Sequence, residues 1–190
     1  MNPIDILIKY WGHTIFRPKQ ELIIDNVLNQ QDVLALLPTG GGKSVIFQGP
    51  AMYYGLRTGR LTLVISPLKA LMRDQIESLW GIGFWNSVEY LSGDLSRIEV
   101  NDIYRRVSGG EVTMLFVAPE RFRSNQFLKS LGFRVEVDQD SEYWVFDEAH
   151  CISQWGLDFR PDYFYAAKKI KEFKKSFSKA PILFVSATVT

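Results

Sequence analysis

Short runs of apolar residues alternate along the chain with segments in which apolar residues recur at helical spacing. A continuous apolar run that ends at a proline or a turn predicts a strand buried on both faces of a sheet. Such strands are expected at 32–37, 61–66, 88–92, 113–118, 143–146 and 182–186. Apolar residues three and four positions apart predict helices at 3–11, 18–29, 43–56, 68–80, 98–107, 121–131 and 164–177. The polar stretch 133–142 is expected to form a surface hairpin or loop, and Gly49-Pro50 to disturb the third helix.

This alternation predicts the α/β fold class, with a mainly parallel sheet and helices on both of its faces. In sheets of this kind, ligands bind at the carboxyl ends of the strands. The unusual residue clusters of this sequence follow the ends of expected strands. A functional site is therefore expected at that edge of the sheet.

The composition is that of an ordinary globular domain. The 190 residues suit one α/β domain or lobe, and 46% hydrophobic with 23% charged residues exclude a disordered or collagen-like chain. Lysine and arginine (22) almost balance aspartate and glutamate (21), so any nucleic-acid contact must come from local patches. The lone Cys151 excludes an intramolecular disulfide and a cysteine-rich zinc site, and favours an intracellular compartment. Neither a signal peptide nor an apolar stretch of about 18 residues is found, so no membrane span is expected.

A glycine-rich loop follows the first expected strand and reads Pro-Thr-Gly-Gly-Gly-Lys-Ser over 38–44. Glycines let successive backbone N–H groups turn inward around phosphate oxygens, and a helix beginning at Lys43 directs its positive dipole end to the same place. Lys43 can reach the β- and γ-phosphates, and Ser44 can ligate Mg²⁺. Leu37 occupies the first glycine position of the general phosphate-loop pattern, and a flexible turn is the alternative. The order strand, loop, helix favours nucleotide binding, without separating a kinase, a GTPase and a motor.

Two carboxylates, Asp147 and Glu148, follow the expected strand 143–146. An aspartate at a strand end can hold Mg²⁺ directly or through water. The adjacent Glu148 can position and deprotonate an attacking water. An acidic strand-to-loop turn is the plain alternative, and the phosphate loop upstream favours the catalytic interpretation.

These motifs together resemble those of a known family. The segments 37–44, 147–150 and 186–188 resemble helicase motif I, the DEAH form of motif II, and motif III. Their order and spacing are similar to those of the first RecA-like lobe of a superfamily-two helicase, which has a P-loop NTPase fold. The resemblance extends from about Gly12 to Thr188, nearly the whole chain.

Four further segments resemble motifs of the RecQ helicases. They are motif 0 (Phe16–Gln20), motif Ia (Ser66–Gln75), motif Ib (Val117–Arg121) and the aromatic-rich loop (Cys151–Tyr163). In that family this loop links DNA binding to ATP hydrolysis. Leu157 stands where many family members carry histidine, which leaves the role of that position open.

The resemblance implies roles for individual residues. The nucleotide would be held by His13, Arg17, Gln20, Thr39, Gly40, Gly41, Gly42, Lys43 and Ser44, with Arg17 and Gln20 on adenine and His13 where relatives stack a ring. Catalysis would involve Lys43, Asp147, Glu148 as base, and His150, with Mg²⁺ held by Ser44 and Asp147. DNA binding and coupling would involve Lys69, Arg73, Gln154, Trp155, Phe159, Arg160, Ser186 and Thr188.

Plainer interpretations exist for several of these residues. Gln20 fits a helix surface, His150 a turn, and Lys69 with Arg73 the solvated face of a helix. Trp155 and Phe159 could belong to the core, although aromatic rings beside an arginine suit base stacking. The lysine-rich run 168–175 is interpreted as a solvated helix face.

The resemblance implies that residues 1–190 form the ATP-binding lobe of a 3′-to-5′ RecQ-type DNA helicase with roles in DNA repair and recombination. ATP and Mg²⁺ would be used, and partners would be single-stranded and partially duplex DNA and a second RecA-like lobe. The chain stops just past a strand, so it is expected to be part of a longer polypeptide. Residues 1–190 alone are expected to bind nucleotide weakly, to turn over little ATP and to unwind no DNA. Bacterial cytoplasm is the expected location, or the nucleus in a eukaryote.

Two other classes remain open. One is a non-catalytic nucleic-acid-binding module with a decayed ATPase fold, which the intact Lys43, Asp147 and Glu148 disfavour. The other is a DEAD- or DEAH-type RNA helicase lobe, which motif 0 and the aromatic-rich loop disfavour.

Overall fold

The computed structural model describes residues 2–137, 142–152, 160–177 and 180–187. Its α-helices are α1 (Pro3–Trp11), α2 (Gln20–Leu28), α3 (Lys43–Thr58), α4 (Lys69–Leu79), α5 (Arg97–Ser108), α6 (Asn125–Val137) and α7 (Pro161–Phe177). Its strands are β1 (Val33–Leu37), β2 (Leu61–Ile65), β3 (Val88–Leu91), β4 (Met114–Val117), β5 (Glu142–Phe146) and β6 (Ile182–Ala187). Short turns of other helix types cover Trp80–Phe84, Pro119–Arg123 and Ala149–Ile152.

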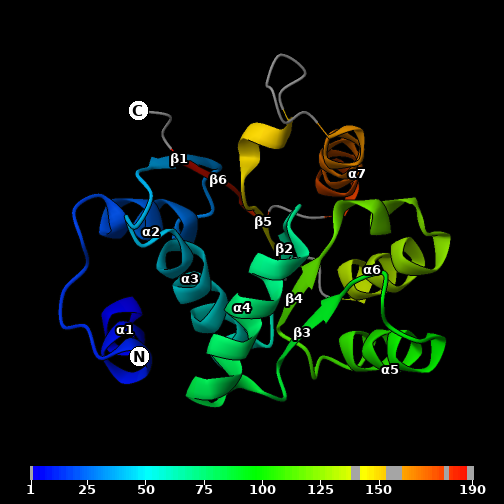
Figure 1. The fold of residues 1–190 in the computed structure, drawn as a ribbon, viewed down its shortest axis with the longest axis horizontal. Coiled ribbons are helices and arrows are strands. Elements are labelled where there is room, and N and C mark those ends of the chain that lie inside the picture. The colour runs from blue at the N-terminus through cyan, green and yellow to red at the C-terminus, as the bar shows by residue number, and fades with distance from the viewer. Residues whose placement is uncertain (1, 138–141, 153–159, 178–179, 188–190) are drawn as a thin grey trace.

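The six strands form one sheet in the order β1-β6-β5-β2-β4-β3, and every neighbouring pair is parallel. Helices α1 to α4 pack on one face and α5 to α7 on the other, as Figure 1 shows. Neighbouring residues of β5 accordingly belong to different cores: Tyr143 and Val145 pack towards α1 to α4, and Trp144 and Phe146 towards α5 to α7. The predicted α/β class, with a parallel sheet covered on both faces, is confirmed.

The strand registers bring the ends of distant segments together. Leu36 of β1 lies beside Ser186 of β6, and Ile65 of β2 lies beside Phe146 of β5. Because all strands run in one direction, the loops that leave β1, β2, β5 and β6 open on the same edge of the sheet. That edge receives the glycine-rich loop and the acidic pair.

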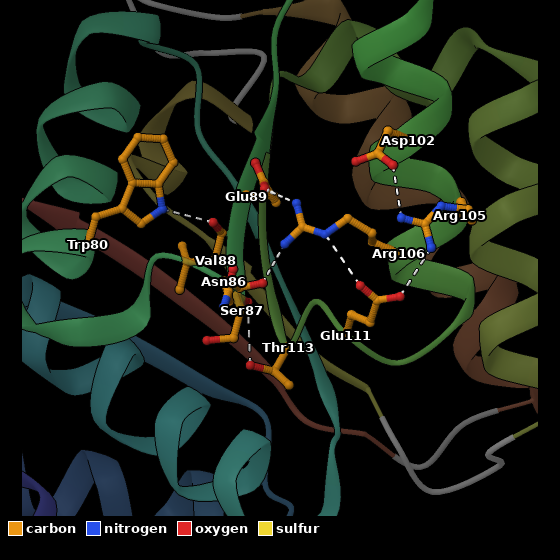
Figure 2. Close-up of polar contacts among 10 residues, drawn as sticks. All are labelled: Trp80, Asn86, Ser87, Val88, Glu89, Asp102, Arg105, Arg106, Glu111 and Thr113. Carbon is orange, nitrogen blue, oxygen red and sulfur yellow. Dashed lines mark hydrogen bonds and ion pairs between the residues drawn. The ribbon is translucent and has the colours of Figure 1, made fainter.

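Strand β3 is the outermost strand on the side of the sheet away from β1, and a polar network, drawn in Figure 2, holds it in place. Arg106 of α5 forms ion pairs with Glu89 of β3 and with Glu111, the latter at 3.6 Å. The indole Nε1 of Trp80 donates a hydrogen bond to the carbonyl of Val88 at 3.0 Å. The sheet order places this network at the far side of the sheet from β1, so we assign it a structural role.

The predicted helix at 121–131 and the loop at 133–142 are wrong in position. A 3₁₀ turn covers Pro119–Arg123, Ser124 is extended, and the helix begins at Asn125. The Ser124 hydroxyl accepts a hydrogen bond from the Phe127 N–H at 3.3 Å, which caps the new helix start. The helix then continues to Val137, into the stretch expected to be irregular.

The expected disturbance at Gly49-Pro50 does not end α3. The helix continues through Pro50 to Thr58 and ends at Gly59, whose φ of 67° is left-handed. The residues flanking Pro50 are buried in the core, among them Phe47 and Met52, and this packing offsets the hydrogen bond that proline cannot donate. Within the part of the chain that the structure describes, no helix is long and apolar enough to cross a membrane.

Candidate nucleotide-binding site

The glycine-rich loop leaves β1 and enters α3 through two left-handed residues. Gly40 has φ 75° and Gly42 has φ 74°, a region that side chains disfavour. A Cβ on Gly41 would lie 2.8 Å from the carbonyl oxygen of Pro38, and one on Gly42 would lie 2.3 Å from Nε2 of Gln20. Gly41 therefore requires glycine for space, and a side chain at position 42 would displace the Gln20 amide. The exposed Thr39 and the half-buried Ser44 lie on either side of these glycines, and α3 begins at Lys43.

Gln20 and Arg17, predicted to contact adenine, hold the glycine-rich loop in this structure. Gln20 is 4% exposed, and its Nε2 donates to the carbonyl of Gly42 at 3.1 Å. Its Oε1 accepts a hydrogen bond from the Arg17 N–H at 2.8 Å, and the Arg17 guanidinium donates to the carbonyl of Gly40. Motif 0 and the phosphate loop thus form one hydrogen-bonded unit. The plain interpretation of Gln20 as a surface residue is wrong.

A cavity of about 400 Å³ lies beside this unit. It is lined by Leu7, Gly12, His13, Thr14, Ile15, Arg17, Gln20, Gly42 and Val45. Ile15, which is 78% exposed, contributes an apolar side chain to this lining. Five of these residues were not predicted from the sequence: Leu7, Gly12, Thr14, Ile15 and Val45. The apolar side chains among them carry no signal of their own for a binding role.

The acidic pair meets the glycine-rich loop directly. Lys43 Nζ and Glu148 Oε1 lie 3.2 Å apart, and both side chains are less than a fifth exposed. Glu148 Oε2 lies 3.3 Å from His150 Nδ1, which in turn lies 3.2 Å from the Ser186 hydroxyl. A continuous polar chain therefore runs from Lys43 at the start of α3, through Glu148 and His150 after β5, to Ser186 near the end of β6. Four residues predicted from three separate motifs are brought together.

Glu148 adopts a left-handed backbone conformation, with φ 52°. This region costs a residue other than glycine about 1–2 kcal/mol. Such strain concentrates at functional sites, where the surrounding structure maintains it. The sequence did not predict this backbone conformation, which accompanies the placement of the carboxylate against Lys43.

Asp147 is 5% exposed, and hydrogen bonds reach both of its carboxylate oxygens. Oδ1 accepts from the Glu148 N–H at 3.0 Å, and Oδ2 accepts from Nε2 of Gln75 at 3.4 Å. Burial, and next the carboxylate of Glu148, raise the pKa of Asp147, while the Lys43 ammonium opposes the change. A buried carboxylate beside a glutamate is costly without more positive charge, so a divalent cation would suit Asp147.

Gln75 was not singled out as a site residue. It belongs to α4, and its Oε1 accepts from Nε2 of the buried Gln48 at 3.4 Å, which orients the amide towards Asp147. The available signal was its position: Met72, Ile76 and Leu79 of α4 are buried, and Gln75 shares their helical spacing. A polar residue on an inward face calls for a buried partner.

The cations predicted for DNA binding lie at the same edge of the sheet. Lys69 is exposed at the first position of α4, and Arg73, one turn on, pairs with Asp94 at 3.3 Å. Both line a cavity of about 300 Å³ with Ser92 and Asp94. Arg160 is exposed and donates through Nη1 to the Pro67 carbonyl at 2.9 Å. Gln154, Trp155, Phe159 and Thr188 lie outside the described residues.

Comparisons with known proteins agree on the family. The model of the DEAD/DEAH box helicase family matches residues 17–190. An ATP-dependent DNA helicase RecQ from Haemophilus influenzae is 35% identical over 97% of this chain, which spans 28% of that protein. A probable ATP-dependent DNA helicase RecS from Bacillus subtilis is 35% identical over 97%, and the chain spans 34% of it.

Solved structures share the fold. The helicase MrfA bound to DNA and AMPPNP matches all of this chain and 26% of its own, with a TM-score of 0.76 and 16% identity. The Pyrococcus furiosus Hef helicase domain covers 90% of this chain and 33% of its own, with a TM-score of 0.60 and 21% identity. At these identities the likeness establishes a RecA-like helicase fold.

Proposed function

The chain belongs to the DEAD/DEAH box helicase family and to its RecQ branch, and from this premise we propose that residues 1–190 are the first RecA-like lobe of an ATP-dependent 3′-to-5′ DNA helicase. The observation that carries the proposal is the polar chain from Lys43 through Glu148 and His150 to Ser186. It joins the residues that motifs I, II and III contribute. Hydrolysis at one end can thereby be linked to movement at the other.

ATP hydrolysis would proceed in the space between the glycine-rich loop and the acidic pair. The backbone N–H groups of 39–44 would hold the phosphates, and Lys43 would exchange its pairing with Glu148 for the β- and γ-phosphates. The freed Glu148 carboxylate would accept a proton from the attacking water. The water oxygen bonds to the γ-phosphorus as the bond to the bridging oxygen breaks, which releases ADP and phosphate.

Mg²⁺ fits the donor set of Asp147 and Ser44 and, when bound, would neutralise charge on the phosphate oxygens. Asp147 would be oriented for this by Gln75 and by the Glu148 N–H. Adenine would enter the cavity lined by His13, Arg17 and Gln20. Because Gln20 also contacts Gly42, occupation of the base pocket would stabilise the phosphate loop.

DNA would contact the cations at the carboxyl edge of the sheet, Lys69, Arg73 and Arg160. Phosphate oxygens would be the partners of Lys69 and Arg73. Trp155 and Phe159 stay predictions as stacking residues, with Gln154 and Thr188 as coupling residues. The second lobe would supply arginines to the transition state, an effect worth about 10³- to 10⁵-fold in other NTPases. A role in repair and recombination in the nucleoid or nucleus follows from this activity.

The test uses the longer natural polypeptide and replaces the proposed base by Glu148→Gln. DNA-stimulated ATP hydrolysis should fall by about 10²-fold or more, because general base catalysis is removed, while ATP binding persists. Glu99→Gln, on the far side of the sheet at the start of α5, is the matched control and should leave hydrolysis unchanged. Equal activity of the wild type and Glu148→Gln would contradict the proposal, and a preference for single-stranded RNA would favour an RNA helicase.

A further inference from the structure

Tyr163 lies between the carboxyl ends of β2 and β5. It belongs to the first turn of α7 and is fully buried. Its hydroxyl donates to the carbonyl of Ile65 at 2.7 Å and, more closely, to the carbonyl of Asp147. The ring packs edge-on against Phe146 with centroids 5.6 Å apart. One side chain on a helix thus contacts two strand ends, one of them at the proposed Mg²⁺ ligand.

The hydroxyl is what distinguishes this residue from a packing aromatic. A phenylalanine would fill the same volume and keep the contact with Phe146. A tyrosine hydroxyl carries one proton and can donate it to a carbonyl oxygen. It has one proton for two carbonyls, and Ile65 already accepts from the Asp147 N–H at 2.9 Å. The arrangement connects Asp147, β2 and α7 at a single point.

Arg160, directly before α7, makes two more contacts with the same region. Arg160 Nη1 donates to the Pro67 carbonyl, just past β2, at 2.9 Å. The Arg160 N–H donates to the carbonyl of Cys151, four residues after Asp147, at 3.0 Å. In the sequence, Cys151 and Arg160 bracket the central part of the aromatic-rich loop. The Tyr163 N–H donates to the Arg160 carbonyl at 3.0 Å, so a shift of Arg160 would reach Tyr163 directly.

We propose that Tyr163 is a positioning residue whose hydroxyl fixes the main chain of Asp147 against β2 and transmits movement of the first turn of α7 to the metal-binding carboxylate. It touches neither substrate nor metal. The inference rests on the proposed function, because it assigns a consequence for Mg²⁺ use and for DNA stimulation of ATP hydrolysis.

The test replaces Tyr163 by phenylalanine in the longer natural polypeptide, with Tyr54→Phe as the matched control. Tyr54 is also a buried tyrosine whose hydroxyl donates to two backbone carbonyls, those of Val27 at 3.3 Å and Leu28 at 3.4 Å. These contacts lie at the end of α2 and not at the acidic pair. Both variants lose one hydroxyl, so a merely structural effect should appear in both.

Tyr163→Phe should raise the Mg²⁺ concentration at half-maximal ATP hydrolysis by about three- to tenfold, the size expected for one hydrogen bond. The ratio of DNA-stimulated to basal hydrolysis should fall by a similar factor, with little change in KM for ATP. Tyr54→Phe should leave both quantities within about twofold of the wild type. Equal Mg²⁺ midpoints and stimulation ratios in the two variants would overturn the inference.

Thermal melts show whether each variant folds. If Tyr163→Phe does not fold, hydrogen exchange on the wild type tests the inference instead. Amide hydrogen exchange with and without Mg-ATP should then show added protection at 162–165, in the first turn of α7. Protection confined to the phosphate loop and the acidic pair would overturn the inference. A wild type without Mg²⁺-dependent, DNA-stimulated hydrolysis would instead contradict the proposed function, so the two failures are distinguishable.

Discussion

At the scale of single residues, Gly42 shows how little freedom the phosphate loop has. Its φ of 74° is left-handed, and a Cβ there would lie 2.3 Å from the amide of Gln20. The same amide donates to the Gly42 carbonyl at 3.1 Å. Space for the hydrogen bond and space for a side chain are therefore exclusive. A side chain at position 42 would therefore displace Gln20 of motif 0 from the loop that is proposed to hold the phosphates.

Gly42→Ala should weaken Mg-ATP binding by about tenfold or more, because Gln20 must move and the loop must open. The control is Gly59→Ala at the end of α3. Gly59 has a similar φ of 67°, but no atom lies within 4 Å of its added Cβ, so it carries the backbone cost without the clash. Calorimetric titration of both variants with Mg-ATP measures the difference. An equal loss of affinity in the two would mean that the contact with Gln20 is irrelevant.

Asp147 makes the stability of the nucleotide-free protein depend on pH. Burial, followed by the Glu148 carboxylate, raises the pKa of Asp147. Between the ordinary aspartate pKa of about 3.9 and this raised value, the native state binds more protons than the unfolded chain. The free energy of unfolding therefore falls as pH rises through that interval. Asp147→Asn removes the ionisation and should raise Tm near neutral pH.

Thermal melts from about pH 4 to about pH 7 measure this change in Tm. Asp94→Asn is the control, because its Tm should change in the opposite direction. A hydrogen bond from Ser92 lowers the pKa of Asp94, so its stabilisation is present at neutral pH and is lost on acidification. Asp94→Asn should lower Tm near neutral pH. A lower Tm for Asp147→Asn as well would contradict the account of that buried carboxylate.

At the scale of elements, the ends of β5 and β6 are joined by His150 and Ser186. The imidazole Nδ1 lies 3.2 Å from the Ser186 hydroxyl and 3.3 Å from Glu148 Oε2. Motif III thereby reaches the proposed base through one imidazole. This is the contact through which hydrolysis would affect the end of β6.

Ser186→Ala should keep basal ATP hydrolysis within about threefold and lower DNA-stimulated hydrolysis by about tenfold in the longer polypeptide, because the link to β6 is lost. Ser66→Ala is the matched control. Ser66 is a buried serine at the end of β2, and its hydroxyl has no hydrogen-bond partner among the described residues. Steady-state assays with and without single-stranded DNA compare the two. A similar drop in stimulation for both variants would count against the link.

The elements themselves were largely predictable from the sequence. Buried parallel strands appear as apolar runs, and all six lie within two residues of the expected ranges. The error at 121–131 arose because the propensity for a helix does not show where it starts. There Pro119 favours a 3₁₀ turn and Ser124 caps the following helix, a local competition that apolar spacing does not register.

At the scale of the whole molecule, the order of the sheet explains which predictions succeeded. Motifs that follow strands had to meet at one edge, so the meeting of Lys43, Glu148 and Ser186 was foreseeable. The contacts that helices make with the strand ends were not foreseeable from the sequence. Gln75 and Tyr163 reach Asp147 from α4 and α7, and nothing in their spacing shows which strand end they meet.

The whole-molecule account requires that motif 0, the phosphate loop and the acidic pair form one adenine nucleotide site. Lys43 is its charged centre, paired with Glu148 and adjacent to Gly42, which Gln20 contacts. A guanine nucleotide has the same phosphates and a different base. Competition between the two nucleotides therefore separates recognition of the base from recognition of phosphate.

The most direct measurement is calorimetric titration of this chain with Mg-ATP, for the wild type and for Lys43→Ala, with GTP as competitor. We predict weak binding, with a Kd of about 10⁻⁶ to 10⁻³ M, that Lys43→Ala abolishes and that excess GTP does not displace. Binding that survives Lys43→Ala, or that GTP displaces as well as ATP, would contradict the account. So would a lack of binding both here and in the longer polypeptide.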